Sequence, residues 1–249
     1  MEDDSLLRYS RHILLPEFGL EGQEKVGRAH VLVIGAGGLG SPASLYLASS
    51  GVGKITICDD DVVDLTNLQR QILHPASSIG LAKVLSARKT LESMNPGITI
   101  SPVEARAEGS LLDELVKDAD LVIDAADNFA TRHGVNRACV KYGKPLVSGA
   151  AIRFDGQVSV FDLRTPESPC YHCLFPEHAE DEEMRCALMG VFAPVTGIIG
   201  AIQALEALKL LAGIGQSLSG RLLILDGRAM TCREISLERD PGCPVCSSR

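Results

Sequence analysis

The sequence predicts an α/β fold in which antiparallel strands near the C-terminus extend a doubly wound, mainly parallel sheet. Short β-branched runs alternate with helical patterns over roughly the first 150 residues, an order that produces parallel strands with helices on both faces. A glycine-rich turn joins the first of these strands to a helix. After Gly149 apolar residues alternate with polar ones, as they do in antiparallel strands.

The expected elements follow one another without an internal repeat. Strands are expected where apolar, β-branched residues cluster, at 30–34, 54–58, 98–103, 120–125, 146–148, 157–163, 222–226 and 232–237. Helices are expected where apolar residues recur with a helical period, at 5–15, 38–50, 79–94, 111–117, 132–141 and 192–212. We therefore predict a single domain over residues 1–249, comprising a helical lead-in (1–28), a nucleotide-binding half (29–150) and a C-terminal half (151–249).

Composition excludes several classes of function. Hydrophobic residues make up 45% of the 249 residues, which indicates an ordered core. The 24 Lys and Arg against 32 Asp and Glu give a formal charge of −8, which disfavours a nucleic-acid partner. Apolar runs fall short of the ~18 residues that span a membrane, and Glu2, Asp3 and Asp4 are the reverse of a basic secretory signal. We expect a cytoplasmic protein without a membrane partner.

The glycine turn, Gly35 to Gly40, reads Gly-Ala-Gly-Gly-Leu-Gly between a strand and a helix. Such a turn lets backbone N–H groups approach a phosphate at the helix N-terminus. Asp59 closes the second strand, where a carboxylate can bind ribose hydroxyls. The pair predicts a Rossmann-like site for an adenine nucleotide, and either NAD or ATP satisfies it. The alternative is a turn that merely packs the helix on the strand.

The residues after Asp59 favour ATP over a nicotinamide cofactor. Asn67 and Arg70 are three residues apart, on one face if this stretch is helical, and Lys83 follows near the start of the next helix. A triphosphate under attack needs cations that offset its developing charge. The alternative for Arg70 and Lys83 is an ordinary solvated helix face.

Eight cysteines in a chain expected in a reducing compartment point to metal rather than disulfides. Four of them form two Cys-x-x-Cys pairs that can close a tetrahedral zinc site, namely Cys170 with Cys173 and Cys243 with Cys246. We predict a structural zinc clip that fixes the C-terminal tail to the loop after the fifth strand, with redox dithiols as the alternative. Cys58, Cys139 and Cys232 are expected in the core.

Several runs together resemble the bacterial MoeB, ThiF and HesA proteins, relatives of the ubiquitin-activating enzymes: RYSRHILLPEFGLEGQ, GAGGLGSPAS, DLTNLQRQILH and AADN. The likeness covers essentially the whole chain. It implies Mg-ATP-dependent adenylation of the C-terminal glycine of a small ubiquitin-like sulfur carrier protein, with release of pyrophosphate. Molybdopterin (molybdenum cofactor) biosynthesis is the favoured pathway, and thiamine-thiazole synthesis is the alternative. The carrier would end in Gly-Gly and dock on the C-terminal half.

The resemblance also implies residue roles. The residues that would hold ATP are Gly38, Asp59, Asn67, Arg70, Lys83, Asp127 and Asn128, joined by Arg132. Asp127 would hold Mg²⁺, and Arg11 would enter the site of the other protomer of a homodimer. Asp127 has an alternative role as the N-cap of the following helix. Cys186, in a loop at about 176–190 expected to be mobile, would form a covalent sulfur link to the carrier or remain a free thiol.

The implied chemistry agrees with the absence of an evident base. A C-terminal carboxylate has a reference pKa of roughly 3.5 and is already ionised, and the six histidines form no nucleophile–base pattern. Catalysis would then be electrostatic, through Arg11, Arg70, Lys83 and a metal on Asp127. The alternative from another class of enzyme is an NAD(P)-dependent oxidoreductase. It is disfavoured because the sequence offers no plausible acid for a hydride-transfer site. A catalytically silent carrier-binding scaffold is a third hypothesis.

Overall fold

The computed structural model describes residues 3–177 and 189–248, and one eight-stranded sheet runs through both halves of the chain. The strands lie in the order β3-β2-β1-β4-β5-β6-β7-β8. Neighbours from β3 to β5 are parallel, and those from β5 to β8 are antiparallel, which confirms the predicted fold. The bounds are β1 His30–Ile34, β2 Lys54–Cys58, β3 Thr99–Val103, β4 Leu121–Asp124, β5 Leu146–Ile152, β6 Asp155–Phe161, β7 Arg221–Asp226 and β8 Thr231–Ser236.

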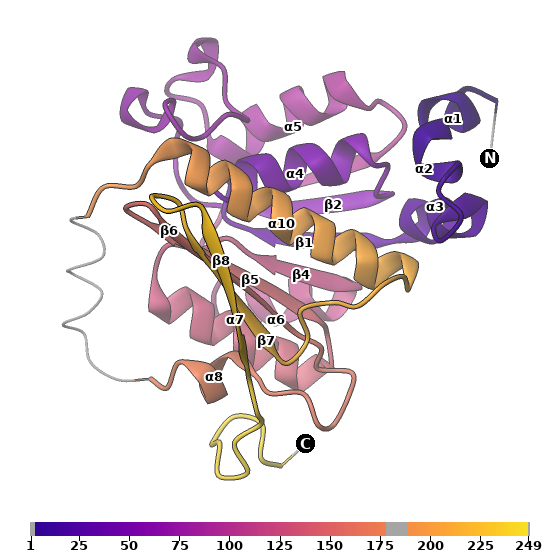
Figure 1. Cartoon of the computed structure of the whole chain (residues 1–249). Coiled ribbons are helices and arrows are strands. Elements are labelled where there is room, and N and C mark those ends of the chain that lie inside the picture. The colour runs from indigo at the N-terminus through magenta and orange to yellow at the C-terminus, as the bar shows by residue number, and fades with distance from the viewer. Residues whose placement is uncertain (1–2, 178–188, 249) are drawn as a thin grey trace.

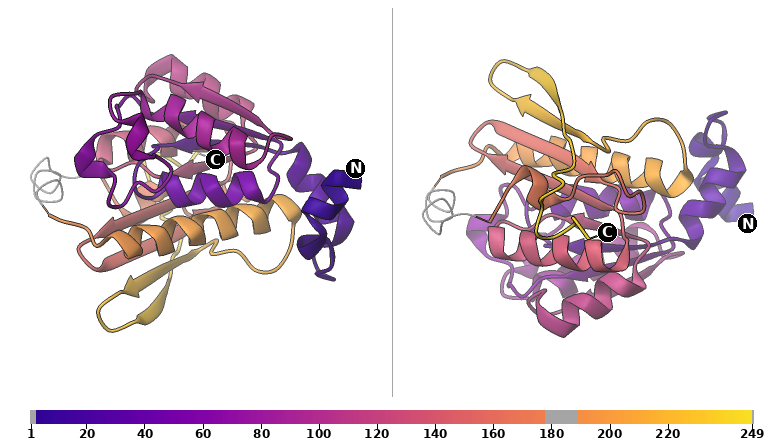
Figure 2. Two further views of the ribbon diagram at one scale, coloured as in Figure 1. Left: turned by 90° about the horizontal axis from the view of Figure 1, so that it is seen from above. Right: turned by 90° about the horizontal axis from the view of Figure 1, so that it is seen from below.

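Helices cover both faces of this sheet (Figures 1 and 2). One face carries α4 (Gly40–Ser49), α5 (Lys83–Met94) and α10 (Ala193–Ala212). The other carries α6 (Gly109–Asp118) and α7 (Phe129–Tyr142), and the short α8 (Tyr171–Leu174) contacts α7. At the end where β1 begins lie α1 (Asp3–Arg8), α2 (Ser10–Ile13) and α3 (Gly19–Arg28).

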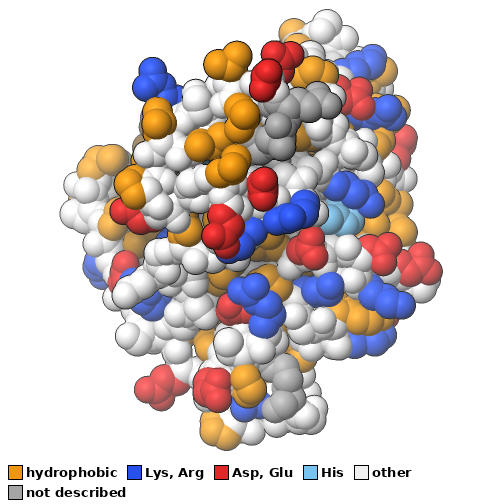
Figure 3. All heavy atoms as spheres, turned by 90° about the vertical axis from the view of Figure 1, so that its right-hand side faces the viewer, with side chains coloured by type: hydrophobic (Ala, Val, Ile, Leu, Met, Phe, Trp, Pro, Cys, Tyr) orange, Lys and Arg blue, Asp and Glu red, His pale blue; other side chains and the backbone are white. Residues whose placement is uncertain are grey.

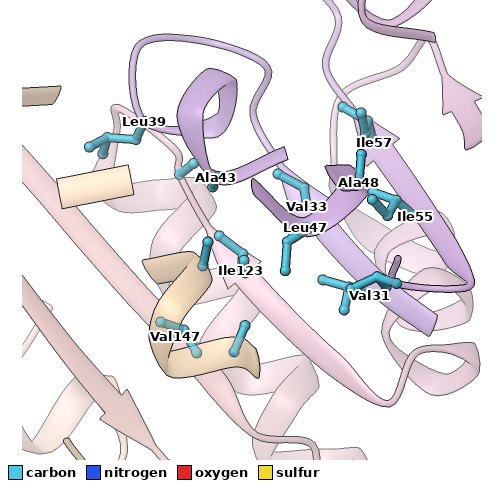
Figure 4. Packing of buried hydrophobic residues seen from close by; sticks show 14 of the residues in the cluster. Val31, Val33, Leu39, Ala43, Leu47, Ala48, Ile55, Ile57, Ile123 and Val147 are labelled. Atoms are coloured by element: carbon cyan, nitrogen blue, oxygen red, sulfur yellow. The ribbon is translucent and has the colours of Figure 1, made fainter. Parts of the chain in front are cut away.

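The core lies on both sides of β1. Val31 and Val33 pack with Leu47 of α4 in one cluster, and Figure 4 shows these side chains meeting between strand and helix. Leu32 points the other way, into the cluster that includes Val116 of α6. All five side chains are fully buried. Burial on both faces explains why β1 reads as an uninterrupted apolar run.

The helix α10 is long and apolar enough to cross a membrane by length and composition, and half of that stretch is buried in the protein. It packs along α4 and across β5 and β6, as the orange helix in Figure 1 shows. Glu206 within it is buried and accepts from the Leu218 N–H at 2.7 Å. Packing against the sheet therefore accounts for its apolar character.

Three sequence-based expectations were wrong in detail. The helix expected at 79–94 begins at Lys83, because residues 76–78 form a 3-10 turn and the segment after it is extended to pair Val62 with Ala82. The short helix and lead-in expected at 5–15 are two short helices, α1 and α2. Cys232 is exposed rather than buried in the core, because β8 is an edge strand whose six residues are all exposed. Cys58 and Cys139 are buried, as expected.

Candidate active site

The glycine turn after β1 brings the chain close to the loop that follows β4. Gly35 has a φ of +96°, and a Cβ on it would lie 2.8 Å from the carbonyl oxygen of Ala125. A Cβ on Gly40 would lie 1.9 Å from the carbonyl oxygen of Gly35, so both positions need glycine. Because α4 begins at Gly40, the N–H groups of its first turn face this end of the sheet and favour a phosphate.

Hydrogen bonds fix Ala36, the second residue of the turn. Its N–H donates to Asp59 Oδ2 at 2.7 Å, and its carbonyl oxygen lies 2.8 Å from His74 Nε2. Since a carbonyl oxygen can act only as an acceptor, His74 Nε2 carries the hydrogen, and Nδ1 accepts from Ser86 Oγ at 3.0 Å. Burial raises the pKa of Asp59 and lowers that of His74. These contacts hold the turn in shape without a ligand.

The predicted nucleotide-binding positions meet at the carboxyl edge of the sheet. Asp59 follows β2, the glycine turn follows β1, and Asp127 follows β4. These three strands are parallel neighbours, so their carboxyl ends lie side by side. Open α/β sheets place their ligand sites at this edge. Gly38 belongs to the same group, packed against Thr196 at the start of α10.

The predicted phosphate-binding cations lie between β2 and α5. Lys83 is the first residue of α5, its side chain is 6% exposed, and its Nζ lies 2.7 Å from Asp61 Oδ2. Arg70 is partly exposed, and its Nη1 donates to Thr66 O at 3.1 Å. Asn67 ends a 3-10 turn and accepts from the Arg70 N–H at 3.1 Å. The stretch is thus a series of turns rather than the α-helical face considered from the sequence.

Asp127 and Asn128 have separate roles in the structure. Asn128 caps α7, because its Oδ1 accepts from the Thr131 N–H at 2.8 Å. The alternative role of Asp127 as N-cap is therefore wrong. The Asp127 carboxylate is exposed and accepts from Asn128 Nδ2 at 3.3 Å. An exposed carboxylate in the loop after a strand is a ligand of the kind Mg²⁺ prefers.

Arg132 is buried, and its guanidinium points toward the sheet. It pairs with Asp124 at 3.2 Å and donates to the carbonyl oxygens of Ala126 and Gly149 at 2.5 and 2.9 Å. Gln203 of α10 donates to the Asp124 carbonyl at 2.7 Å. Through these contacts Arg132 fixes the loop that carries Asp127, and its expected phosphate-binding role stays a prediction.

The four predicted zinc ligands converge. Their Sγ atoms lie 3.9 Å apart for Cys170 and Cys173, 3.7 Å for Cys170 and Cys243, and 3.5 Å for Cys173 and Cys246. Four thiolates around one Zn²⁺ at 2.3 Å would be separated by about 3.8 Å. The four sulfur atoms therefore fit a tetrahedral metal site that ties the C-terminal tail to α8.

Comparison with known proteins decides the family. A family model described as the ThiF family matches residues 9–245. The chain belongs to the ThiF family. Molybdopterin-synthase adenylyltransferase of Salmonella typhimurium is 48% identical over 248 residues, covering 99% of this chain and 98% of that protein. The sulfur carrier protein ThiS adenylyltransferase of Escherichia coli is 45% identical over 247 residues, covering 99% of this chain and 97% of that protein. The crystal structure of E. coli MccB with ATP has a TM-score of 0.85 at 25% identity, and the match covers 96% of this chain and 73% of the MccB chain.

One of the predicted site residues that the structure describes in this ThiF-family chain lies away from the carboxyl edge. Arg11 lies on α2, which sits at the opposite end of the sheet, where β1 begins (Figure 1). A role in a nucleotide site would require a second copy of the chain. Cys186 lies outside the described residues, as does most of the loop at 176–190.

Sequence reasoning missed three residues that shape this ThiF-family site: Asp61, His74 and Gln203. Asp61 received no role from the sequence, and His74 was one of six histidines without a nucleophile–base pattern. Their partners Lys83 and Ala36 are distant in the sequence, so the spacing gave no signal. A buried glutamine in an apolar helix, such as Gln203, was the one available hint of a buried polar network.

Proposed function

We propose that this protein adenylates the C-terminal glycine carboxylate of a small ubiquitin-like sulfur carrier protein, using ATP and releasing pyrophosphate. The observation that carries the proposal is the carboxyl edge itself. A glycine turn, the Asp59 carboxylate and the buried Lys83 ammonium meet there in a chain 48% identical to a named adenylyltransferase over its full length. This combination supports nucleotide activation rather than simple nucleotide binding.

The residues supply charge, and the substrate supplies the nucleophile. The carrier carboxylate attacks the α-phosphorus of ATP, its oxygen forms the new P–O bond, and pyrophosphate leaves. Both reactants are anions, so the barrier falls when cations offset their repulsion. Lys83 and Arg70 would face the phosphates, the glycine turn would bind them through N–H groups, and Asp59 would hold the ribose. No general base is required because the carboxylate is ionised.

Two metals complete the proposal. Mg²⁺ on Asp127 would neutralise phosphate charge as a Lewis acid. Zn²⁺ on Cys170, Cys173, Cys243 and Cys246 would be structural, because four thiolates leave no open coordination position. Asp127 would be oriented by Asn128 and by the loop that Arg132 fixes.

We further propose a homodimer in which Arg11 serves the partner's site. Its place at the amino end of the sheet removes it from the carboxyl edge of its own chain. Leucines on and directly after the surrounding helices are exposed, among them Leu7 at 74% and Leu14 at 70%, as expected of a face that a second subunit covers. The carrier, with a Gly-Gly end, would dock on the C-terminal half.

For the pathway, we propose molybdopterin biosynthesis. The identity of 48% to the molybdopterin-synthase enzyme, against 45% to the ThiS enzyme, supports this order. Both relatives span nearly the whole chain, so thiamine-thiazole synthesis is the second candidate.

Pyrophosphate–ATP exchange tests the proposal. We expect exchange that depends on Mg²⁺ and on a Gly-Gly-ended carrier, faster with the molybdopterin-synthase small subunit than with the ThiS carrier. Removing the last glycine of the carrier is the matched control and should abolish exchange. Absence of exchange together with NADH binding would instead support the oxidoreductase alternative.

A further inference from the structure

Lys83 occupies a position that is unfavourable for a lysine without a counter-ion. It is the first residue of α5, where the helix dipole carries partial positive charge, and it is buried. Cations are favoured at the opposite end of a helix. A buried ammonium at this point therefore requires an anion beside it in every state of the protein.

Asp61 is that anion in the structure. Its Oδ2 lies 2.7 Å from Lys83 Nζ, and its carbonyl oxygen accepts from the Lys83 N–H at 2.9 Å. The Val63 N–H donates to Leu81 O at 2.8 Å, so the Asp61 segment is fixed to the start of α5. The Asp61 side chain is 67% exposed, so the ion pair opens toward solvent rather than into the core.

The Lys83 charge also reaches the ribose-binding position. Carboxylate oxygens of Asp59 and Asp61 lie within 4.8 Å of one another, so the ammonium that pairs with Asp61 is close to Asp59 as well. Burial raises the pKa of Asp59, and the Lys83 ammonium opposes this rise. The two oxygens of Asp59 already accept from the N–H groups of Ala36 and Asp61. Asp61, not Asp59, therefore forms the ion pair with Lys83.

We propose that Asp61 acts as a positioning residue and internal competitor: it holds Lys83 while the site is free of nucleotide and competes with the phosphates when ATP binds. The inference rests on the proposed function, because it assumes that Lys83 meets phosphate. When ATP binds, a phosphate oxygen takes the place of the Asp61 carboxylate beside Lys83. The free energy gained from the contact between Lys83 and phosphate is therefore smaller than it would be for a lysine without a partner. After the reaction, the Asp61 carboxylate competes with pyrophosphate for Lys83 in the same way, which favours release of pyrophosphate.

Asp61→Asn tests this with a non-hydrolysable α,β-methylene analogue of ATP and Mg²⁺, measured by titration calorimetry. We expect binding tighter on the order of tenfold, the equivalent of about one charge-assisted hydrogen bond. The increase in Tm caused by saturating analogue should also be larger than in the wild type. A merely structural role would lower Tm with and without analogue alike.

Asp60→Asn is the matched control, since it removes the same charge from the adjacent, exposed residue. It should change the affinity by less than about twofold, because screening weakens exposed charges that lack direct contact. Asp61→Glu retains the charge and should bind as the wild type does. In the double variant with Lys83→Gln, the Asp61→Asn substitution should give no gain.

Equal or weaker binding by Asp61→Asn would overturn this inference alone, provided that the wild type binds the analogue. Failure of the wild type to bind would overturn the proposed function, and this inference with it. If Asp61→Asn does not fold, Asp61→Ser serves as the second variant, with the same expected direction.

Discussion

At the scale of single residues, burial distinguishes Arg132 from its surface neighbour on the same helix. The Arg132 and Asp124 side chains are 9% and 1% exposed, whereas Arg137 and its partner Glu177 are 53% and 49% exposed. Breaking a buried pair leaves a charge without compensation, which is costly, whereas a surface pair is screened by water. The two arginines therefore allow a direct comparison.

We expect Arg132→Ala to lower the free energy of unfolding by about 3–5 kcal/mol, because Asp124 would keep a buried charge without its cation. Arg137→Ala should cost less than about 1 kcal/mol. Urea unfolding at neutral pH measures both. Similar values for the two variants would contradict a structural role for the Arg132 network.

The burial of His74 predicts that the stability of the protein depends on pH, and the shift of the His74 pKa gives the sign of this dependence. Burial lowers the folded-state pKa of His74 below its ordinary value of 6.5. The unfolded chain therefore binds this proton more readily, so the stability that neutral His74 contributes is present above pH 6.5 and is lost as pH falls toward the folded pKa. Burial lowers the pKa of His30 and His133 as well, so the effect is shared.

We expect His74→Gln, whose amide can still donate to Ala36 O, to lose less stability than the wild type between pH 7 and about pH 5. The free energy of urea unfolding, measured across this range, checks the slope. Identical slopes for the two proteins would show that His74 does not titrate as its burial implies.

At the scale of elements, the strands were predictable and several boundaries were not. β1 and β2 match their expected bounds because continuous β-branched runs buried on both faces leave a strong local pattern. The start of α5 was missed because pairing of Val62 with Ala82 extends the residues before it, and such a contact leaves no local trace. Cys232 was misplaced because an edge position in a sheet cannot be read from one strand.

The candidate site was also predictable only in part. The glycine turn and the four cysteines were recognisable because a motif needs its residues at fixed spacing. The hydrogen bonds that support the glycine turn and the end of β4 join residues far apart in the chain, namely His74 with Ala36 and Gln203 with Asp124. Spacing within one sequence carries no information about such pairs.

The four-cysteine site predicts that a metal attaches the C-terminal residues after β8 to the rest of the protein. We expect about one Zn²⁺ per chain, lost in the variant Cys243→Ser with Cys246→Ser, with proteolysis then confined to the residues after β8. A loss of about 2 kcal/mol would lower Tm by roughly 4–8 °C. Elemental analysis and limited proteolysis measure these effects.

Cys232→Ser is the control for the zinc variants, because this cysteine lies on the exposed strand β8, apart from the cluster. It should retain the metal and resist the protease. Nucleotide binding should persist in all of these variants, since the carboxyl edge is built from other strands. Full metal content in the double variant would contradict the assigned ligands.

At the scale of the whole molecule, the two ends of the parallel strands carry different surfaces. The carboxyl edge holds the proposed nucleotide-binding positions, and the amino end holds α1 to α3 with Arg11. Figure 3 faces this amino end and shows hydrophobic side chains among basic and acidic ones. A chain that needs Arg11 for catalysis must therefore receive it from a second copy.

Mixed dimers test that arrangement. We expect Arg11→Ala and Lys83→Gln each to reduce carrier-dependent exchange by at least about 100-fold, since each removes a cation from the site. In a heterodimer of the two variants, the subunit with intact Lys83 would receive Arg11 from its partner. That heterodimer, isolated through two different affinity tags, should regain about half of the wild-type activity, because one of its two sites is complete. A heterodimer as inactive as its parents would mean that Arg11 acts within its own chain. Full activity of Arg11→Ala alone would remove it from the mechanism, leaving Arg70 and Lys83 to offset the charge.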